Sequence, residues 1–581
     1  MKKSLRYLVA IGTALLAGFS GMAYSAGIPS YVDLRPLSQT VTTPVGDVAS
    51  SGPALLPVIT WGGDIATILA QGNSLSTQPG SIFAGKGLNY TLRREDVFQK
   101  QVEMYVSGQS PFLRGTMGQI NSAVEVAARD ARTQLTVIYK LTRSTGGDVL
   151  VVRDAIKTAK DLCGKTIALQ ANGPHLDYLS TVITSAGCAG GMKSVKLKWV
   201  KELTGKSGQT SADALRFDPS VDAVFVISPD AAELTAGGKV GTGAEGSVKG
   251  ARILMSTKTA DNVIIDAYAV RSDYYKANRD KVAQLVNALT LADDALKSIV
   301  KQKSAKPAEY KAVFTASAKF LLDSAQAIPE AEGLYADCTF AGVGGNIEFF
   351  ANANNPRGYE KIRVEVQSAL VALGMLAKPA EVAQANWDYN AVRAGSVAAQ
   401  AVAPVVEKFD RAEVAKIAQQ SEKLVAGELF SFEVRFTPEQ SDFPMAQYVE
   451  AFDRVAKLAS TYGGAIISVE GHSDPMGYLR ARKDGNPETI LKQTEAAAKN
   501  LSLARANKVR DGVMAYAKQK GITLDPSQFA VVGQGIWKPK SGVDKGGFPN
   551  APTSEAEWKS NMRVEFRIVQ VEAEAKAFKP L

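Results

Sequence analysis

The stretch STGGDVLVVRDAIKTAKDLCGKTIALQ, residues 144–170, shows the pattern that decides the fold of the larger part of the chain. Its two short apolar runs, DVLVVR (148–153) and KTIALQ (165–170), predict strands. Between Leu55 and about Gly395, similar runs alternate with amphipathic helical patterns: PVITW (57–61), QLTVIYKL (134–141) and VDAVFVIS (221–228). Strands and helices in alternation predict an α/β fold with a mainly parallel sheet.

The sequence pattern changes after residue 395. Residues 396–427 contain no strand pattern and are rich in Ala, Val, Glu, Lys and Gln, which predicts a largely helical, semi-rigid connector. Strand and helix patterns then follow in the order β-α-β-α-β-β over residues 428–572, which predicts a smaller α+β domain. Residues 27–54, rich in Thr, Ser, Pro, Gly and Val, precede the α/β part as a leader segment.

Composition excludes several classes of protein. The 581 residues suggest about four compact units. An apolar fraction of 45% and a charged fraction of 22% are typical of a soluble globular protein. Only two histidines occur, and the three cysteines never approach a CxxC spacing, so we expect no metal and no cofactor. No Lys/Arg run with interleaved aromatic residues is present, so we expect no nucleic-acid partner.

The N-terminus predicts export. Lys2, Lys3 and Arg6 precede an apolar core from Leu8 to Phe19, and small residues follow at Ala23 and Ser25. This pattern is typical of a signal peptide spanning residues 1–25 and cleaved after Ser25. No cysteine lies near the cleavage site, which excludes a lipid anchor there. Removing the three positive charges of this segment lowers the net charge from +9 to +6.

The tripeptide His472-Ser473-Asp474 resembles the three side chains of a hydrolytic triad only in composition. Consecutive side chains point in divergent directions, whereas a triad requires a nucleophile, a base and an orienting acid that converge. The only other histidine, His175, lies some 300 residues away. We therefore predict no catalytic residue in this stretch.

Four motifs in this region resemble those of the OmpA-like peptidoglycan-binding domain. They occur in the family's order: VEGHSD (469–474), LSLARANKV (501–509), GQGIWKP (533–539) and NMRVEFRI (561–568). The resemblance implies binding of the diaminopimelate residue of the peptidoglycan stem peptide, and hence a periplasmic location. It assigns Asp474 to the ligand's ammonium group and Arg505 to its carboxylate, with Arg505 in the first turns of a helix. His472 is expected to be a structural hydrogen-bonding residue.

Three features depart from that family's pattern. The segment between Asp474 and Leu501 is longer than usual, Ala498 replaces an asparagine, and Met562 replaces the first arginine of the closing motif. These departures leave the affinity for the wall and its chemistry open.

Residues 55–395 resemble the periplasmic solute-binding proteins of nitrate, sulfonate and taurine ABC importers. The resemblance rests on PVITWGGDIATILA (57–70), the stretch 144–170 quoted above, VDAVFVISPDAAEL (221–234) and DNVIIDAYAVRSDYYKANRDKVAQLVNAL (261–289). It implies two lobes that close over a small solute, an anion in particular. The candidate contacts are Trp61, Asp64, Arg114, Thr116, Ser144, Thr145 and Gly146.

The cysteines predict one disulfide. Cys163 precedes the run GKTIALQ, and Cys188 follows the helical pattern TVITSAG. A strand and a returning helix can bring such positions within disulfide reach, and an oxidising compartment permits the bond. Cys338 would remain a buried thiol.

Together these patterns predict a non-enzymatic, periplasmic solute-binding protein or sensor, tethered to peptidoglycan by its C-terminal domain. Its expected partners are peptidoglycan, a small solute of unknown identity, and an ABC permease or an envelope protein complex. The alternative is a wall-associated scaffold whose two-lobed domain contacts a protein. A wall-degrading enzyme would need a convergent acid/base pair, and the sequence shows none.

Overall fold

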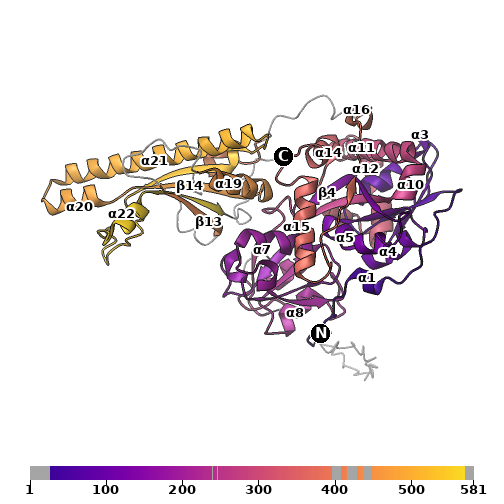
Figure 1. Ribbon diagram of the computed structural model, residues 1–581, viewed down its shortest axis with the longest axis horizontal. Helices are drawn as coiled ribbons and strands as arrows, with labels where there is room; N and C mark the ends of the chain where they lie inside the picture. Colours follow the sequence, from indigo (N-terminus) through magenta and orange to yellow (C-terminus); the bar gives the residue numbers. More distant parts are fainter. Residues whose placement is uncertain are drawn as a thin grey trace, which may run out of the picture.

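The computed structural model describes residues 27–237, 240–244, 246–395, 407–414, 428–435 and 448–569. The expected signal peptide and most of the expected 396–427 connector lie outside these residues. Figure 1 shows a two-lobed α/β body from which a narrower α+β domain extends, as the sequence predicted. Among the described helices, none is both long and apolar enough to cross a bilayer.

The first lobe is built on a sheet with the strand order β11-β4-β10-β3, and β12 pairs with β4. A parallel pair of strands, β1 and β2, lies beside this sheet. The strands are β1 (Ala54–Val58), β2 (Tyr90–Arg94), β3 (Phe112–Thr116), β4 (Leu135–Ser144), β10 (Ile265–Arg271), β11 (Cys338–Phe340) and β12 (Ala383–Gln384). The helices are α2 (Asp64–Ala70), α3 (Ile82–Gly85), α4 (Phe98–Val106), α5 (Met117–Ser122), α6 (Val124–Ala127), α10 (Ser272–Ala277), α11 (Arg279–Lys301), α12 (Pro307–Leu322), α13 (Ile328–Ala336), α14 (Gly342–Phe350), α15 (Tyr359–Ala372) and α16 (Tyr389–Val392).

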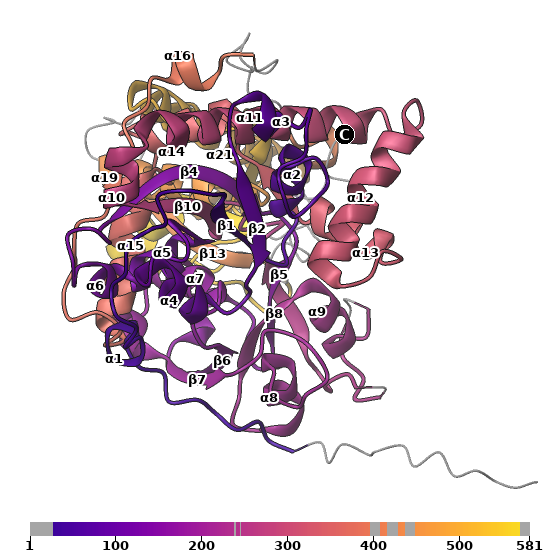
Figure 2. The same ribbon diagram turned by 90° about the vertical axis from the view of Figure 1, so that its right-hand side faces the viewer.

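The second lobe is built on a sheet with the order β7-β6-β8-β5-β9. Its strands are β5 (Asp148–Val152), β6 (Thr166–Gln170), β7 (Lys196–Val200), β8 (Ala223–Ile227) and β9 (Arg252–Ser256). Its helices are η1 (Ala159–Leu162), α7 (His175–Ala186), η2 (Gly191–Ser194), α8 (Ser211–Phe217) and α9 (Ser228–Leu234). The chain crosses between the lobes twice, at residues 145–147 and 257–264. Figure 2 shows the two lobes one above the other, with α5 of the first beside α7 of the second.

The expectation of mainly parallel sheets is wrong. In the first lobe, β10 pairs antiparallel with both β3 and β4. In the second, β5 pairs antiparallel with β8 and β9, whereas β6 pairs parallel with β7 and β8. The physical reason is the double crossing. The chain leaves the first lobe along β4 and returns along β10, so the two crossing strands run in opposite directions.

The leader segment packs against both lobes. Val32 forms an isolated β-bridge with Trp199 at the edge of the second lobe, and the Tyr31 hydroxyl donates a 2.6 Å hydrogen bond to Asp218. The short helix α1 (Leu37–Thr40) follows, and Leu37 and Val41 are buried in the core of the first lobe. The leader therefore connects the lobes by a route separate from the two crossings.

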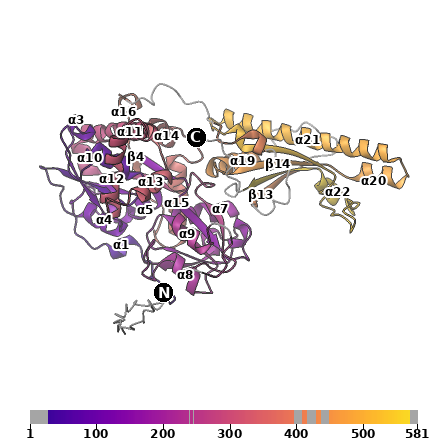
Figure 3. The same cartoon turned by 180° about the vertical axis from the view of Figure 1, so that it is seen from behind.

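The C-terminal domain is a four-stranded sheet with the order β13-β16-β14-β15. Its elements are β13 (Glu428–Arg435), α19 (Val449–Thr461), β14 (Ile466–His472), α20 (Met476–Lys483), α21 (Glu488–Gln519), η5 (Pro526–Gln528), β15 (Phe529–Gly535), α22 (Glu555–Asn561) and β16 (Arg563–Val569). Figure 3 shows α21 running along the length of this domain, with α20 at the end remote from the lobes. On the other face of the sheet, Phe409 and Val414 pack against Ile466 and Ala530.

The helix that carries Arg505 begins earlier than expected. The LS motif led us to place Arg505 in the first turns, but α21 already begins at Glu488. The amides around Arg505 are therefore inside a helix and are bonded to preceding carbonyls, so they are not available to an anion. Any anion at this position depends on the guanidinium alone.

The expected disulfide between Cys163 and Cys188 is present, with the two Cα atoms 5.5 Å apart. Cys338 is a buried free thiol, also as expected. Cys163 follows η1, which contacts β13 of the C-terminal domain. The disulfide therefore lies close to the surface on which that domain docks.

Candidate functional site

The corner where β14 and β15 end holds Asp474, and α21, the helix that carries Arg505, crosses it. Two glycines allow α21 to cross directly over the strands there. A Cβ on Gly471 would overlap the carbonyl of Ser502, and one on Gly533 would lie 2.7 Å from the carbonyl of Lys499. The Ser502 hydroxyl also accepts a 3.0 Å hydrogen bond from the amide of Gly535. The glycines and the serine of the sequence motifs thus form the corner by close packing.

Asp474 follows β14 and is held from both sides. Its neighbour Ser473 donates its amide to the Gly535 carbonyl at 2.8 Å and its hydroxyl to the Ala498 carbonyl at 2.9 Å. The Asp474 Oδ2 atom accepts the Met476 amide at 3.2 Å, whereas Oδ1 is buried and has no hydrogen-bond partner among the described residues. Burial raises the pKa of the Asp474 carboxyl, although Trp558, the Met476 amide and Arg480 lower it in part.

Arg505 lies one turn beyond Ser502 on the same helix, and the carbonyl of Ser502 packs on Gly471 near the end of β14. Its side chain is almost fully buried, and burial lowers the pKa of its guanidinium. The extra segment 475–500 forms α20 and the first third of α21, which pack on each other beside the corner. Figure 1 shows this corner on the half of the domain remote from the lobes.

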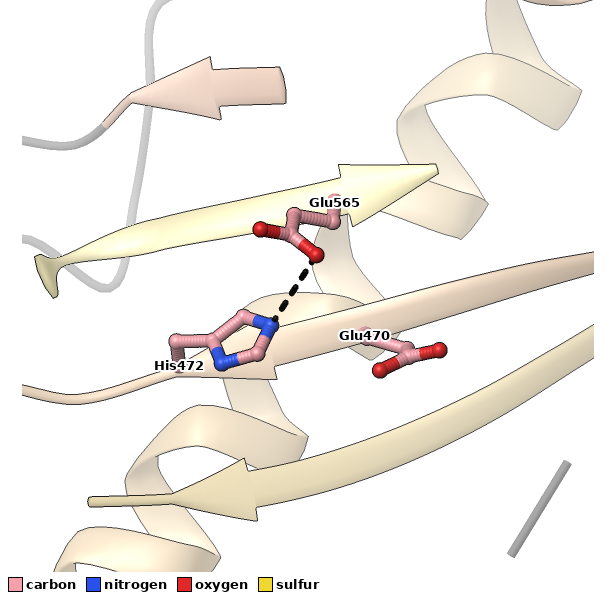
Figure 4. A group of neighbouring side chains, drawn as sticks. All are labelled: Glu470, His472 and Glu565. Atoms are coloured by element: carbon pink, nitrogen blue, oxygen red, sulfur yellow. Dashed lines mark ion pairs between the residues drawn. The ribbon is translucent and has the colours of Figure 1, made fainter. Parts of the chain in front are cut away.

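His472 is buried at the end of β14, as expected, but neither ring nitrogen makes a hydrogen bond among the described residues. Its Nε2 atom lies 3.6 Å from Glu565 Oε2, and Glu470 is the third member of the group in Figure 4. Burial lowers the pKa of His472, and the neighbouring Glu565 opposes this effect. The expected hydrogen-bonding role of His472 stays a prediction, and Glu565 is the acid that lies beside it.

The negative charges of Glu565 and Glu470, the carboxylates around His472, are already balanced by neighbouring donors. Glu565 accepts hydrogen bonds from Arg563 Nε at 2.6 Å and from Arg567 at 2.9 Å. Glu470 accepts one from Gln534 at 2.8 Å. Burial alone would raise the pKa of Glu565, but His472 and Arg563 hold it well below its ordinary value. The geometry would accommodate a cation, but two guanidinium groups already balance two carboxylates, so we assign a structural ion network.

The candidate contacts Trp61, Asp64 and Arg114 belong to one buried network in the first lobe. Arg114 forms ion pairs with Asp64 at 2.9 Å and with Asp266 at 2.6 Å, and its side chain is completely buried. Asp266 also accepts the Thr142 hydroxyl at 2.9 Å, and that hydroxyl accepts the Trp61 indole N–H at 3.1 Å. The Arg114 charge is therefore neutralised within the lobe, and in this conformation a solute cannot reach it.

Two carboxylates compete for this single guanidinium. Burial is the main cause that raises the pKa of Asp64 to about 7, and the nearby Asp266 adds to the effect. Arg114 acts in the opposite direction and lowers it. The network therefore gains stability when one of its acids is protonated.

Thr116 contacts the other lobe. Its hydroxyl donates a 2.7 Å hydrogen bond to Asp177, which lies on α7 of the second lobe. Burial raises the pKa of Asp177 to about 7, against the opposing effects of the Thr116 hydroxyl and the Gly118 amide. The strongest interaction of this candidate contact is thus with a carboxylate of the protein itself.

The remaining candidates line the first crossing. Thr257, in the second crossing, accepts the Gly146 amide at 3.0 Å and lies 2.8 Å from the Ser144 hydroxyl. Thr145 lies 3.1 Å from the hydroxyl of Thr339. These three residues therefore tie the two crossings to each other and to the first lobe.

Sequence reasoning missed four residues of the junction, namely Thr142, Asp177, Thr257 and Asp266. Asp266 carried a signal, because it is an acid inside the apolar run of β10. Asp177 stands in the first turn of α7, where acids are common for helix stability alone, so it did not stand out.

No protein-family model matches the chain, and no curated protein matches it either. Solved structures resemble it over part of its length. The alkanesulfonate-binding protein SsuA from Xanthomonas axonopodis pv. citri, solved with MOPS, is 16% identical with a TM-score of 0.37 over 58% of this chain and 100% of that one. The nitrate-binding protein NrtA from Synechocystis PCC 6803 is 11% identical with a TM-score of 0.38 over 61% and 90%. The desulfurization enzyme DSZB is 15% identical with a TM-score of 0.29 over 57% and 95%.

Proposed function

We propose that the protein is a non-enzymatic, exported envelope protein that binds peptidoglycan through its C-terminal domain and a small solute between its two lobes. The observation that carries the wall-binding part is the Asp474 carboxylate. One of its oxygens is buried without a hydrogen-bond partner in the described part of the chain, beside the helix that holds Arg505. A buried, unsatisfied carboxylate oxygen is costly unless a donor reaches it.

The diaminopimelate side chain supplies the matching chemistry. It ends in a carbon that bears both an ammonium and a carboxylate group, so it needs an acid and a base at one site. Asp474 is suited to the ammonium, and Arg505 can grip the carboxylate with two parallel hydrogen bonds. The position of this corner, remote from the lobes, would leave the two-lobed body accessible while the domain is bound to the wall.

The test is sedimentation of the mature, full-length protein with purified peptidoglycan. We expect Asp474→Ala and Arg505→Ala each to weaken binding by at least about tenfold, because breaking a desolvated charge pair typically costs about 2–5 kcal/mol. His472→Gln is the control and should bind almost as wild type does. If both charge variants remain folded by circular dichroism and sediment as wild type does, wall binding through this corner is refuted.

The solute part of the proposal concerns the junction between the lobes, where hydroxyl and amide groups of both lobes converge. A thermal-shift screen of small anions and zwitterions against the full-length protein tests it, since a ligand that binds only the folded state raises the melting temperature. Delivery of the solute to an ABC permease would follow only if a ligand is found.

A scaffold role is the second candidate, and two observations favour it. The polar groups at the junction are satisfied by one another, and the leader segment joins the lobes by an additional route. A two-lobed domain held in this way could present a fixed surface to a protein of the envelope. Recovery of one reproducible partner by cross-linking in intact cells, together with no hit in the solute screen, would support the scaffold role.

A further inference from the structure

A buried carboxylate of the second lobe contacts the first lobe where their helices α7 and α5 meet. Asp177, 1% exposed on α7 of the second lobe, directs both of its oxygens at the first lobe. Oδ2 accepts the hydroxyl hydrogen of Thr116, and Oδ1 accepts the amide hydrogen of Gly118, each at 2.7 Å. Both donors belong to the junction between β3 and α5. The donors of one lobe are thus saturated by an acid of the other.

The glycine at position 118 is explained by this contact. Its backbone is not in the left-handed region, so conformation alone does not require glycine there. A Cβ at this position would, however, overlap the Asp177 carboxylate. Glycine at position 118 therefore allows the Asp177 carboxylate to approach the backbone closely.

Neighbouring contacts keep the lobes together on either side of Asp177. The Gln119 side chain donates a 2.9 Å hydrogen bond to the carbonyl of Asn172, just before α7. On the other side of the junction, the Ser228 hydroxyl lies 3.3 Å from Asp337. The contact through Asp177 differs from these two because it is fully buried and uses both oxygens of a carboxylate.

We propose that Asp177 is an internal ligand, a carboxylate of the second lobe that occupies the position of a bound oxyanion and holds the two lobes closed on each other. The inference rests on the proposed solute site, because it assigns that site an autoinhibited state. A solute that uses the Thr116 hydroxyl and the Gly118 amide must displace Asp177 first. An anion that binds Thr116 and Gly118 more weakly than Asp177 does therefore cannot displace this carboxylate.

The experiment is hydrogen–deuterium exchange of the mature, full-length protein at pH 8, where Asp177 is ionised. In Asp177→Ala we expect the amides of residues 116–122 and 172–181 to exchange about tenfold faster, because the buried interlobe hydrogen bonds are lost. A large excess of acetate should restore protection by filling the vacated position, and the uncharged acetamide should not. Glu233→Gln, an exposed acid of the same lobe, is the matched control and should leave these amides unchanged.

Thr116→Val removes one of the same hydrogen bonds from the other lobe and should accelerate exchange in the same peptides. If Asp177→Ala and Thr116→Val both keep wild-type protection, the lobes are held by other contacts and the proposal fails. If acetate and acetamide restore protection equally, the vacated position accepts any small molecule that fits and does not select an anion. That result would also overturn the proposal. The exchange rates of the wild type and of the two variants are compared without any added solute. An empty thermal-shift screen would therefore count against the proposed function and leave that comparison standing.

Discussion

The amide of Gly464, in the C-terminal domain, donates a 3.1 Å hydrogen bond to the carbonyl of Thr259, in the second crossing between the lobes. The same crossing receives two further contacts. The Asn262 side chain donates to the Ser460 carbonyl at 3.1 Å, and Lys408 pairs with Asp261 at 2.8 Å. The C-terminal domain therefore rests on a segment that would have to bend if the lobes moved, so the two parts of the protein are mechanically connected.

Gly464→Ala should separate the two parts, because a Cβ there would overlap the Lys258 carbonyl. We expect a loss of about 1–3 kcal/mol of stability, the usual cost of overpacking. Differential scanning calorimetry should show one unfolding transition splitting into two. Gly477→Ala, at an exposed position of α20 where an added Cβ would make only an ordinary contact with the Thr494 methyl group at 3.9 Å, is the control. A single, unshifted transition in Gly464→Ala would contradict the docking.

Replacing Cys163 and Cys188 together with serine should lower the free energy of unfolding by about 2–4 kcal/mol, because the bond closes a loop 25 residues long in sequence separation. Urea denaturation is the measurement. Wild type treated with a thiol reductant should fall to the stability of the double variant, and the reductant should leave the variant itself unchanged. Equal midpoints for oxidised wild type and the variant would argue against a stabilising bond.

Glu565→Ala should destabilise the C-terminal domain by about 3–5 kcal/mol, since it leaves the buried Arg563 and the partly buried Arg567 without their shared acceptor. The thermal unfolding of this domain checks the expectation. Glu555→Ala is matched in chemistry and should have little effect, because Glu555 is exposed and pairs only with Lys559. Similar melting curves for the two variants would show that the buried network contributes little.

Lys140 predicts a dependence of stability on pH. Burial lowers the pKa of this lysine to about 7, and Arg143 and Arg357 contribute. Between about pH 7 and the ordinary lysine range, Lys140 binds more protons in the unfolded chain than in the folded protein, so this residue contributes a rise in stability with pH. Asp64 and Asp177, whose pKa values are raised to about 7, contribute in the opposite direction. The contribution of Lys140 is therefore the difference between Lys140→Met and wild type: the variant should gain roughly 2–4 kcal/mol more stability at pH 6 than at pH 9, since a tenfold change in proton affinity corresponds to about 1.4 kcal/mol.

Urea denaturation at pH 6 and pH 9 provides the measurement. Lys311→Met, an exposed lysine on α12, serves as the control and should retain the pH dependence of wild type. A gain in stability from Lys140→Met that is equal at these two pH values would contradict the assignment of a buried, weakly basic Lys140.

The sequence predicted the elements of this fold well, because hydrophobic periodicity reports which face of a local segment is buried. The runs at 148–153 and 165–170 became β5 and β6 almost without change of boundary. The start of α21 was missed, although the signal was present. Residues 488–500 are good helix formers, and Pro487 stands directly before them as a helix-start residue. The motif at Leu501, in contrast, predicted that the helix begins 13 residues later than it does.

The sequence by itself determined the order of strands and helices and the pairing of Cys163 with Cys188. These depend on local burial and on contacts between elements close in the chain. Only the tertiary structure decided the mixed direction of the sheets, the neutralisation of Arg114, and the closure of Asp177 on Gly118. The reason is that a donor or a charge in the sequence does not specify its partner. Asp177 reaches Gly118 from 59 residues away, and only the packing of two lobes brings that acid, and no other, to those donors.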